Sequence, residues 1–295
     1  MGCGGVSVNE KYADVNGIRT RYLEQGDGEP LLLIHGGSFG RFSGANDWDT
    51  NIDNLSKHFK VYSIDKIGCG FTDNPRRDEE YVIGSTVQHA FDFLKIMGID
   101  KAIVAGHSRG GYAATRLALE HPEMVKMLII VSSSTLMTPP NPIYNQWDKE
   151  AVKIQDQREK YRYLMAANSY SGAHVTEELV DQMIQIESLS KSKEATAKMD
   201  SGLRKKFNED IVYRQNETQE WIRAGRLKCP TLIIWGFNDP SATMDKCGVP
   251  CMNLIMPSVP ISEMHVLNHA GHYCYREQPQ AFDTLVIDFI RRYSK

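Results

Sequence analysis

The sequence has no long hydrophobic run and no excess of charge of one sign. No stretch of the 295 residues approaches the roughly 18 consecutive apolar residues that indicate a membrane-spanning helix. The 34 Lys and Arg residues nearly balance 37 Asp and Glu residues, which gives a formal net charge of −3. Nucleic-acid-binding chains usually carry a basic patch or run, and none stands out here. We therefore expect neither a membrane nor a nucleic-acid partner.

Cysteine is also scarce and scattered, with six residues at positions 3, 69, 229, 247, 251 and 274. Cys247 and Cys251 are four residues apart, but no second pair and no histidine lies at the spacing of a zinc site. We expect free thiols and no bound metal. Free thiols suit a reducing compartment, so the sequence predicts a cytoplasmic protein.

The N-terminus lacks the features of a targeting segment. It has no basic region followed by an apolar run, which is the pattern of a secretory signal. Gly2 and Cys3 resemble a lipidation start, but Val6 stands where the myristoylation pattern requires Ser or Thr. We expect an unmodified terminus.

What the sequence does contain is an alternation of apolar runs and helical patterns. A hairpin comes first, because segments 12–15 and 18–23 flank Asn16-Gly17, a strong type I′ turn signal. Short runs that suit strands buried on both faces then recur, at 31–34, 61–64, 102–105, 127–131, 231–235 and 264–267. Helical patterns occupy 85–97, 109–120 and 279–292. This alternation predicts an α/β fold with a mostly parallel, doubly wound sheet.

The alternation stops between about residues 137 and 228. This segment is highly charged, begins with Pro139-Pro140, and has helical periodicity at 176–187 and 209–222. We predict a helical cap over 137–228. It would be inserted between two strands of a core formed by 1–136 and 229–295.

The strongest motif is Gly106-His107-Ser108-Arg109-Gly110. It matches G-x-S-x-G, with an apolar strand before it and a small-residue helix after it. A serine on such a tight strand-to-helix turn needs small neighbours, and the two glycines meet that need. It also lies at a helix N-terminus, where the dipole favours developing negative charge. The motif therefore predicts Ser108 as a nucleophile.

A serine nucleophile needs a base, and the base needs an orienting carboxylate. His272 follows the last apolar run, on a loop at the sheet edge where ligands bind in open α/β sheets. His269 is its competitor. Asp239 follows the run at 231–235, and the order Ser, Asp, His is typical of this elbow. The alternative is that Asp239 only caps a helix beginning at Pro240.

An oxyanion hole requires two convergent backbone N–H groups. One is expected from Arg109, the residue after the nucleophile. The other is expected from Gly37 or Ser38, in the glycine-rich loop after the run at 31–34. The side chain of Arg109 could also extend into a surface ion pair.

These motifs resemble the α/β-hydrolase superfamily across nearly the whole chain. The shared positions are 35–37, 65–75, the Ser108 elbow, Asp239 and 270–272. Within the superfamily the chain is most similar to the meta-cleavage-product hydrolases. Those enzymes cleave a carbon–carbon bond in vinylogous 1,5-diketones formed by ring opening of aromatics. That likeness rests on Asn46 and Trp48 after the glycine loop, on Gly-Phe-Thr-Asp at 70–73, and on the cap phrase at 175–180.

The resemblance implies a Ser-His-Asp hydrolase that acts on a small, largely apolar carbonyl substrate without a metal or organic cofactor. It makes six residues candidates for substrate contact: Gly36, Asn46, His107, Met183, Phe237 and Tyr273. Two of them depart from the family. His107 stands where the family often has Asn, and Met183 stands where it usually has an arginine that holds the substrate carboxylate. Cleavage of such acids would then require Arg158 or Arg162 of the cap to reach the pocket.

Three functions remain open at this point. The first is carbon–carbon bond hydrolysis of the meta-cleavage type, and the second is hydrolysis of a small apolar ester or lactone. The third is a non-catalytic small-molecule receptor on the same fold, against which an intact triad argues. The sequence also leaves a homo-oligomer open.

Overall fold

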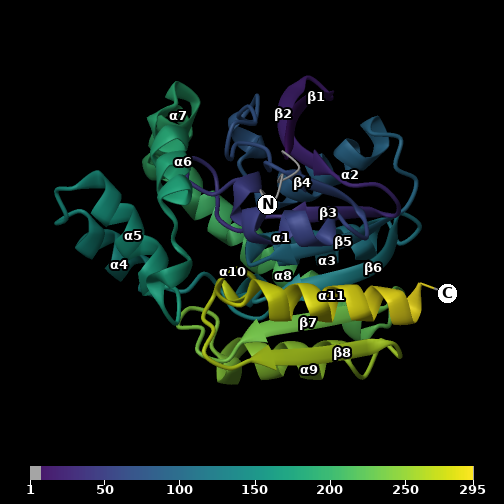
Figure 1. Cartoon of the computed structure of the whole chain (residues 1–295). Coiled ribbons are helices and arrows are strands. Elements are labelled where there is room, and N and C mark those ends of the chain that lie inside the picture. The colour runs from purple at the N-terminus through teal and green to yellow at the C-terminus, as the bar shows by residue number, and fades with distance from the viewer. Residues whose placement is uncertain (1–7, 295) are drawn as a thin grey trace, which may run out of the picture.

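The structure is a computed structural model that describes residues 8–294. Its centre is an eight-stranded sheet in the order β1-β2-β4-β3-β5-β6-β7-β8 (Figure 1). The strands are β1 (Asn9–Val15), β2 (Ile18–Gln25), β3 (Pro30–Ile34), β4 (Lys60–Ile64), β5 (Ala102–His107), β6 (Val125–Val131), β7 (Thr231–Gly236) and β8 (Ser262–Leu267). From β4 to β8 the neighbouring strands in this order are parallel, while β2 is antiparallel to both β1 and β4. The predicted α/β fold with a mostly parallel sheet is confirmed. Gly2 and Cys3 lie outside the described residues.

The hairpin turn follows from its two residues. Asn16 and Gly17 have φ values of 53° and 83°, and Val15 pairs with Ile18 across the turn. Two consecutive positive φ values define a type I′ turn, which glycine and asparagine adopt most easily. The turn predicted from the sequence is therefore present.

Helices cover both faces of the sheet. One face carries α1 (Asp49–Leu55), α10 (Cys274–Glu277) and α11 (Pro279–Tyr293), and the other carries α2 (Ile83–Ile96), α3 (Arg109–Glu120), α8 (Arg204–Arg223) and α9 (Val249–Ile255). Shorter helical turns are η1 (Ala45–Trp48), η2 (Asp78–Glu80), η3 (Ser134–Leu136), η4 (Gly172–His174), η5 (Met199–Leu203) and η6 (Met244–Gly248). In β3, Leu31 and Leu33 pack against the first group, and Leu32 and Ile34 against the second. Both faces are buried, so the strand is apolar throughout.

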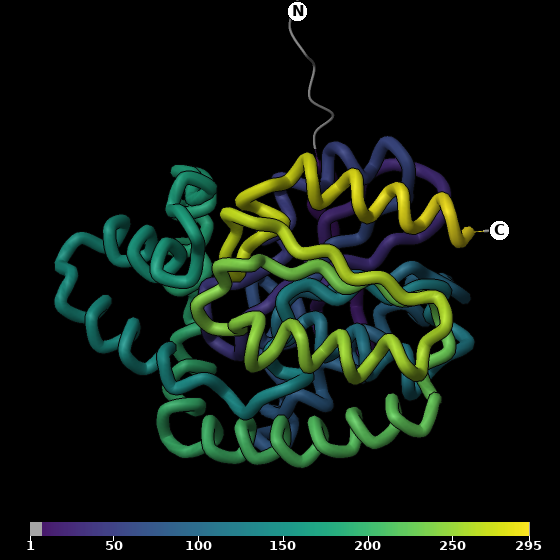
Figure 2. Tube along the Cα trace, turned by 90° about the horizontal axis from the view of Figure 1, so that it is seen from below, coloured from purple at the N-terminus to yellow at the C-terminus, as the bar shows by residue number. Residues whose placement is uncertain are grey.

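Four helices between β6 and β7 lie together at one end of the molecule (Figures 1 and 2). They are α4 (Ile143–Ala151), α5 (Gln157–Ala167), α6 (Glu177–Ser188) and α7 (Ser190–Lys198). This part of the chain has a small apolar cluster of its own, formed by Tyr161, Met165, Val175, Leu179, Val180 and Met183. These helices form a lobe outside the sheet, which we call the cap lobe.

Helix α8 lies in the predicted cap segment but packs on the core. It contacts α2, α3 and α9, and Phe207, Ile211 and Ile222 belong to the apolar cluster that α3 shares with the sheet. Figure 2 shows α8 running along the core while the cap lobe projects to one side. The division of the chain at 137 and 228 stays a prediction. The packing of α8 argues for a second boundary near residue 204.

Residues 8–294 contain neither a membrane-spanning helix nor a cluster of metal-ligating side chains. No helix there is long and apolar enough to cross a membrane. No group of three or more His, Cys, Asp or Glu side chains in the same range could hold a metal ion.

If α8 is part of the core, truncating its buried face should destabilise the whole fold. We expect Ile222→Ala to lower the free energy of unfolding by about 2–5 kcal/mol, because the side chain is fully buried and would leave a cavity. Tyr213→Ala, on the exposed side of the same helix, should change it by less than about 0.5 kcal/mol. Urea unfolding followed by circular dichroism measures both values. Equal effects of the two substitutions would contradict this packing.

Candidate active site

Ser108 lies on a strained turn between β5 and α3. Its φ of 54° and ψ of −121° are unusual for a residue with a side chain. A Cβ atom on Gly106 would lie 2.1 Å from the carbonyl oxygen of Gly110, and one on Gly110 would lie 2.2 Å from that of Ile34. Only glycine fits at either position. The elbow predicted from G-x-S-x-G is present, with Ser108 at the start of the helix.

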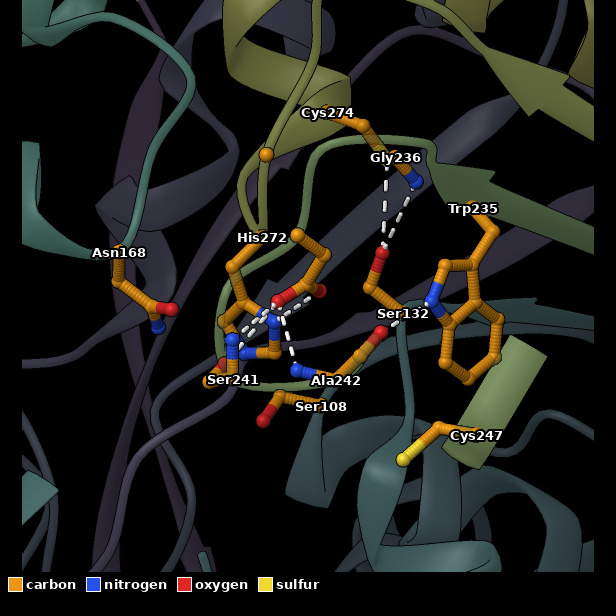
Figure 3. Close-up of polar contacts among 12 residues, drawn as sticks. Ser108, Ser132, Asn168, Trp235, Gly236, Ser241, Ala242, Cys247, His272 and Cys274 are labelled. Atoms are coloured by element: carbon orange, nitrogen blue, oxygen red, sulfur yellow. Dashed lines mark hydrogen bonds and ion pairs between the residues drawn. The ribbon is translucent and has the colours of Figure 1, made fainter. Parts of the chain in front are cut away.

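His272 and Asp239 meet beside this serine. Nδ1 of His272 donates a hydrogen bond of 2.7 Å to Oδ2 of Asp239, and both side chains are buried. Figure 3 shows Ser108 and His272 in one group, and both residues line the same cavity. His269, the competing histidine, is exposed, and its ring packs at a tilt of 31° against the ring of Tyr170. The structure therefore brings together the three predicted triad residues.

The second oxygen of Asp239 is held by its own loop. Oδ1 accepts hydrogen bonds from the backbone N–H groups of Ser241 and Ala242, at 2.9 and 2.7 Å, and from the Ser241 hydroxyl at 3.1 Å. No helix begins at Pro240, so the alternative that Asp239 only caps a helix there is wrong. The carboxylate is fixed by a turn on one oxygen and is free to orient His272 with the other.

His107 supports the loop that carries His272. Its Nε2 donates to the main-chain oxygen of His272 over 3.0 Å, and its Nδ1 lies 3.5 Å from the hydroxyl of Tyr275. Burial lowers the pKa of His107 well below its usual value, so the ring is neutral at pH 7. A neutral ring that donates from Nε2 accepts at Nδ1. His107 lines the cavity and also fixes the backbone of His272.

A buried lysine shapes the predicted oxyanion loop. Nζ of Lys66, two residues after the end of β4, donates to the carbonyl oxygens of Gly36 and Gly37 at 2.6 and 3.0 Å. Burial lowers the pKa of Lys66 to about 8. In a trans peptide the C=O and the following N–H point in opposite directions. The N–H groups of Gly37 and Ser38 therefore point away from Lys66, while the loop lines the cavity beside Ser108.

The cavity above Ser108 has a volume of about 250 Å³. The elbow, the oxyanion loop, the cap lobe and α8 all contribute to its lining. Its charged side chains are Arg41, Asp47, Arg109, Asp148 and Arg204. A more open hollow of about 890 Å³ over α8 shares Pro140, Arg204 and Asn208 with it, so the two adjoin.

Of the six predicted substrate contacts, Gly36, His107 and Tyr273 line the cavity. Asn46 does not, because its side chain accepts a hydrogen bond of 2.8 Å from Arg21. Met183 is buried within the apolar cluster of the cap lobe, and Phe237 is 57% exposed on the surface. These three residues do not line the cavity, so the prediction that they contact the substrate is wrong.

The two cap arginines are also directed elsewhere. Arg158 pairs with Glu177 and Asp181, and Arg162 pairs with Glu177, in both cases on the outside of the cap lobe. Neither lines the cavity. The structure therefore does not place either cap arginine where binding of an acid substrate was expected to require it.

Asp47 faces the cavity, although no motif in the sequence pointed to this residue. It is the residue after Asn46 in η1, where neighbouring side chains point about a third of a turn apart. Burial raises the pKa of Asp47 from 3.8 to about 7. Near neutral pH the cavity therefore holds a carboxyl group that is partly protonated.

A chain of hydrogen bonds joins the cap lobe to the carboxylate of Asp239. Nδ2 of Asn168 lies 3.4 Å from the hydroxyl of Tyr144, which donates to the Ser241 hydroxyl at 2.9 Å, and that hydroxyl donates to Asp239. The main-chain oxygen of Asn168 also accepts the N–H of His272 at 3.0 Å. We call these contacts the cap–triad link, and Figure 3 shows Asn168 and Ser241 in the same view as His272.

Sequence reasoning missed Lys66, Asp47, Tyr144 and Asn168. A lysine two residues after a buried strand, at the edge where ligands bind, was a usable signal for Lys66. The other three lie on helical turns and helix ends, whose facing directions a sequence pattern does not fix.

The geometry fits a known family. The sequence pattern of the α/β-hydrolase fold matches residues 29–279, and the chain belongs to that family. Among curated relatives, the 2-hydroxy-6-oxo-6-(2'-aminophenyl)hexa-2,4-dienoic acid hydrolase of Metapseudomonas resinovorans is 28% identical, over 96% of this chain and 91% of that protein. The 2-hydroxy-6-oxo-2,4-heptadienoate hydrolase of Pseudomonas putida is 26% identical over 93% of both. The chain is thus a hydrolase related to meta-cleavage-product hydrolases.

Solved structures agree with this assignment. The meta-cleavage product hydrolase CumD of Pseudomonas fluorescens IP01 is 25% identical with a TM-score of 0.74, covering 97% of this chain and 98% of that one. The 2-hydroxy-6-oxo-6-phenylhexa-2,4-dienoate hydrolase of Rhodococcus sp. strain RHA1 has a TM-score of 0.78, with 97% and 99% covered, but only 20% identity. The second likeness shows the fold alone.

The raised pKa of Asp47 predicts a pH-dependent contribution to stability. Between about pH 4 and 7 the folded protein keeps a proton that the unfolded chain releases, so this contribution is complete below about pH 4 and is lost as the pH rises through 7. Asp47→Asn cannot titrate there. From pH 4 to 8 the stability of the wild type should fall relative to the variant by at most about 4 kcal/mol. Urea titrations at several pH values test this, and parallel pH curves would contradict it.

Proposed function

We propose that this protein is a serine hydrolase that cleaves the carbon–carbon bond of a meta-cleavage-type ring-opening product. The observation that carries the proposal is the 2.7 Å bond between His272 and Asp239 beside a serine on a strained elbow. Support for the bond type comes from the relatives, which are named as hydrolases of 2-hydroxy-6-oxo-dienoates and related acids and are 25–28% identical over most of both chains.

In this mechanism the Ser108 hydroxyl, or a water in its place, attacks the substrate ketone. His272 takes the proton at Nε2, and Asp239 stabilises the imidazolium through Nδ1. The N–H groups of Arg109 and of Gly37 or Ser38 bind the oxyanion that forms. The carbon–carbon bond then breaks, and His272 returns the proton to the carbon that leaves. If Ser108 was the nucleophile, a water deprotonated by His272 hydrolyses the resulting acyl ester and restores the Ser108 hydroxyl. The hydroxyl of the new acid comes from water by either route, so the net reaction is hydrolysis without a cofactor.

The buried surroundings favour these steps. Asp239 is almost completely shielded, and its two oxygens are fully used by His272 and the turn at 241–242. Such fixed partners need no reorganisation when charge develops on the histidine. The cavity of about 250 Å³ suits a small substrate rather than a polymer.

Ser108→Ala should lower kcat by at least about a thousandfold, since members of a triad act as a unit. The surface substitution Ser188→Ala removes the same hydroxyl group from α6 and should leave kcat unchanged. Turnover of 2-hydroxy-6-oxo-6-phenylhexa-2,4-dienoate and circular dichroism are measured on each preparation. Retained turnover in a folded Ser108→Ala protein would rule out the triad.

A comparison of substrates with the purified wild-type protein shows which type of bond it cleaves. We expect the dienoate to be consumed with release of benzoate, and with a higher kcat/KM than p-nitrophenyl butyrate or a simple lactone. Efficient ester or lactone hydrolysis without dienoate cleavage would replace the proposal with an esterase or lactonase. No turnover of any of these, together with tight binding of one, would point to the receptor alternative.

A further inference from the structure

We propose that the guanidinium of Arg109 is the group that binds the substrate carboxylate, in place of an arginine from the cap. This inference deepens the proposed function and rests on it for the identity of the substrate. Arg109 is the first residue of α3, next to Ser108, and it lines the cavity. Its guanidinium carbon lies 5.4 Å from the centre of the Phe207 ring, which also lines the cavity.

Three arginines line the cavity, Arg41, Arg109 and Arg204, and their ion pairs show which of them is available for a ligand. Arg41 pairs with Asp148 at 2.7 Å, and Arg204 pairs with Asp200 at 2.6 Å. Within residues 8–294, no carboxylate oxygen lies within 4.0 Å of the Arg109 guanidinium. The alternative that Arg109 extends into a surface ion pair is therefore not seen in this part of the chain. Among the described residues, Arg109 is thus the cavity arginine that has no carboxylate partner.

An unpaired cation in a partly buried cavity is costly unless a ligand neutralises it. Burial lowers the pKa of Arg109, and the like charges of Arg41 and Arg204 lower it further. A carboxylate bound there would relieve both effects. A guanidinium holds a carboxylate with two parallel hydrogen bonds, which no neutral group in its place could do.

The position also suits a substrate with two separated functional groups. The backbone N–H of Arg109 is a proposed oxyanion donor, whereas its long side chain extends to Phe207 on α8. One residue can thus serve the reacting carbonyl with its main chain and a distant carboxylate with its side chain. A 2-hydroxy-6-oxo-dienoate carries its ketone and its carboxylate at opposite ends of a conjugated chain, as this arrangement requires.

Binding of a carboxylate can be measured without turnover. The probe is sorbate (hexa-2,4-dienoate), with its neutral amide as the control ligand, titrated calorimetrically into Ser108→Ala protein. We expect sorbate to bind more tightly than sorbamide, and Arg109→Met to weaken sorbate by about tenfold or more while the amide changes little. Arg109→Lys keeps the charge and should recover part of the affinity. Arg158→Met removes the same charge outside the cavity and should have no effect.

The outcomes separate this inference from the proposed function. If Arg109→Met weakens acid and amide equally, or if Arg41→Met alone weakens the acid, the assignment to Arg109 is overturned even when the enzyme cleaves dienoates. If sorbate binding depends on Arg109 but wild-type protein cleaves no dienoate, the carboxylate site stands and the proposed bond type falls. With the active enzyme, Arg109→Met should raise KM for the dienoate about tenfold more than Arg158→Met does. Melting curves show that each variant is folded.

Discussion

The backbone turn at Ser108 is the constraint on which the rest of the site depends. Strands β3 and β5 and helix α3 approach so closely there that Gly106 and Gly110 have no room for a Cβ atom. The positive φ of Ser108 directs its side chain above the edge of the sheet. Because the parallel strands end at that edge, the loops after β3 and β7 and the loop after β8 converge on it. The elbow thus fixes where every other functional group must lie.

Sequence reasoning succeeded where a signal was tied to a strand end. Ser108 and Asp239 each follow a fully buried strand, and His272 follows β8, a half-buried strand at the sheet edge. Parallel pairing brings such strand ends together without knowledge of any side-chain contact. The α/β fold itself followed from the same alternation. The short core helices α1, α9 and α10 were not predicted, and in α9 Pro250 lies in the first turn.

The same reasoning failed where a helix had to be oriented. A shift of one residue decides that Asp47 rather than Asn46 faces the cavity. Met183 turns into the cap lobe because its neighbours form an apolar cluster there, and Arg158 turns outward toward carboxylates. These choices depend on packing between helices distant in sequence, and α8 shows that even assignment to a lobe depends on it. A pattern of apolar residues shows which face of a helix is buried, but not which other element packs against that face.

The cap–triad link has a consequence for how this protein can be rebuilt. Exchanging lids between related hydrolases treats the lid as a module that determines which substrates fit. Here Tyr144 and Asn168 belong to the cap lobe, which is the lid of this protein, yet they hold the loops of Asp239 and His272. A chimera with a foreign lid would therefore lose part of the scaffold of its own catalytic loops. Only a donor lid that supplies a hydroxyl and a carbonyl at the same two places would preserve both recognition and alignment.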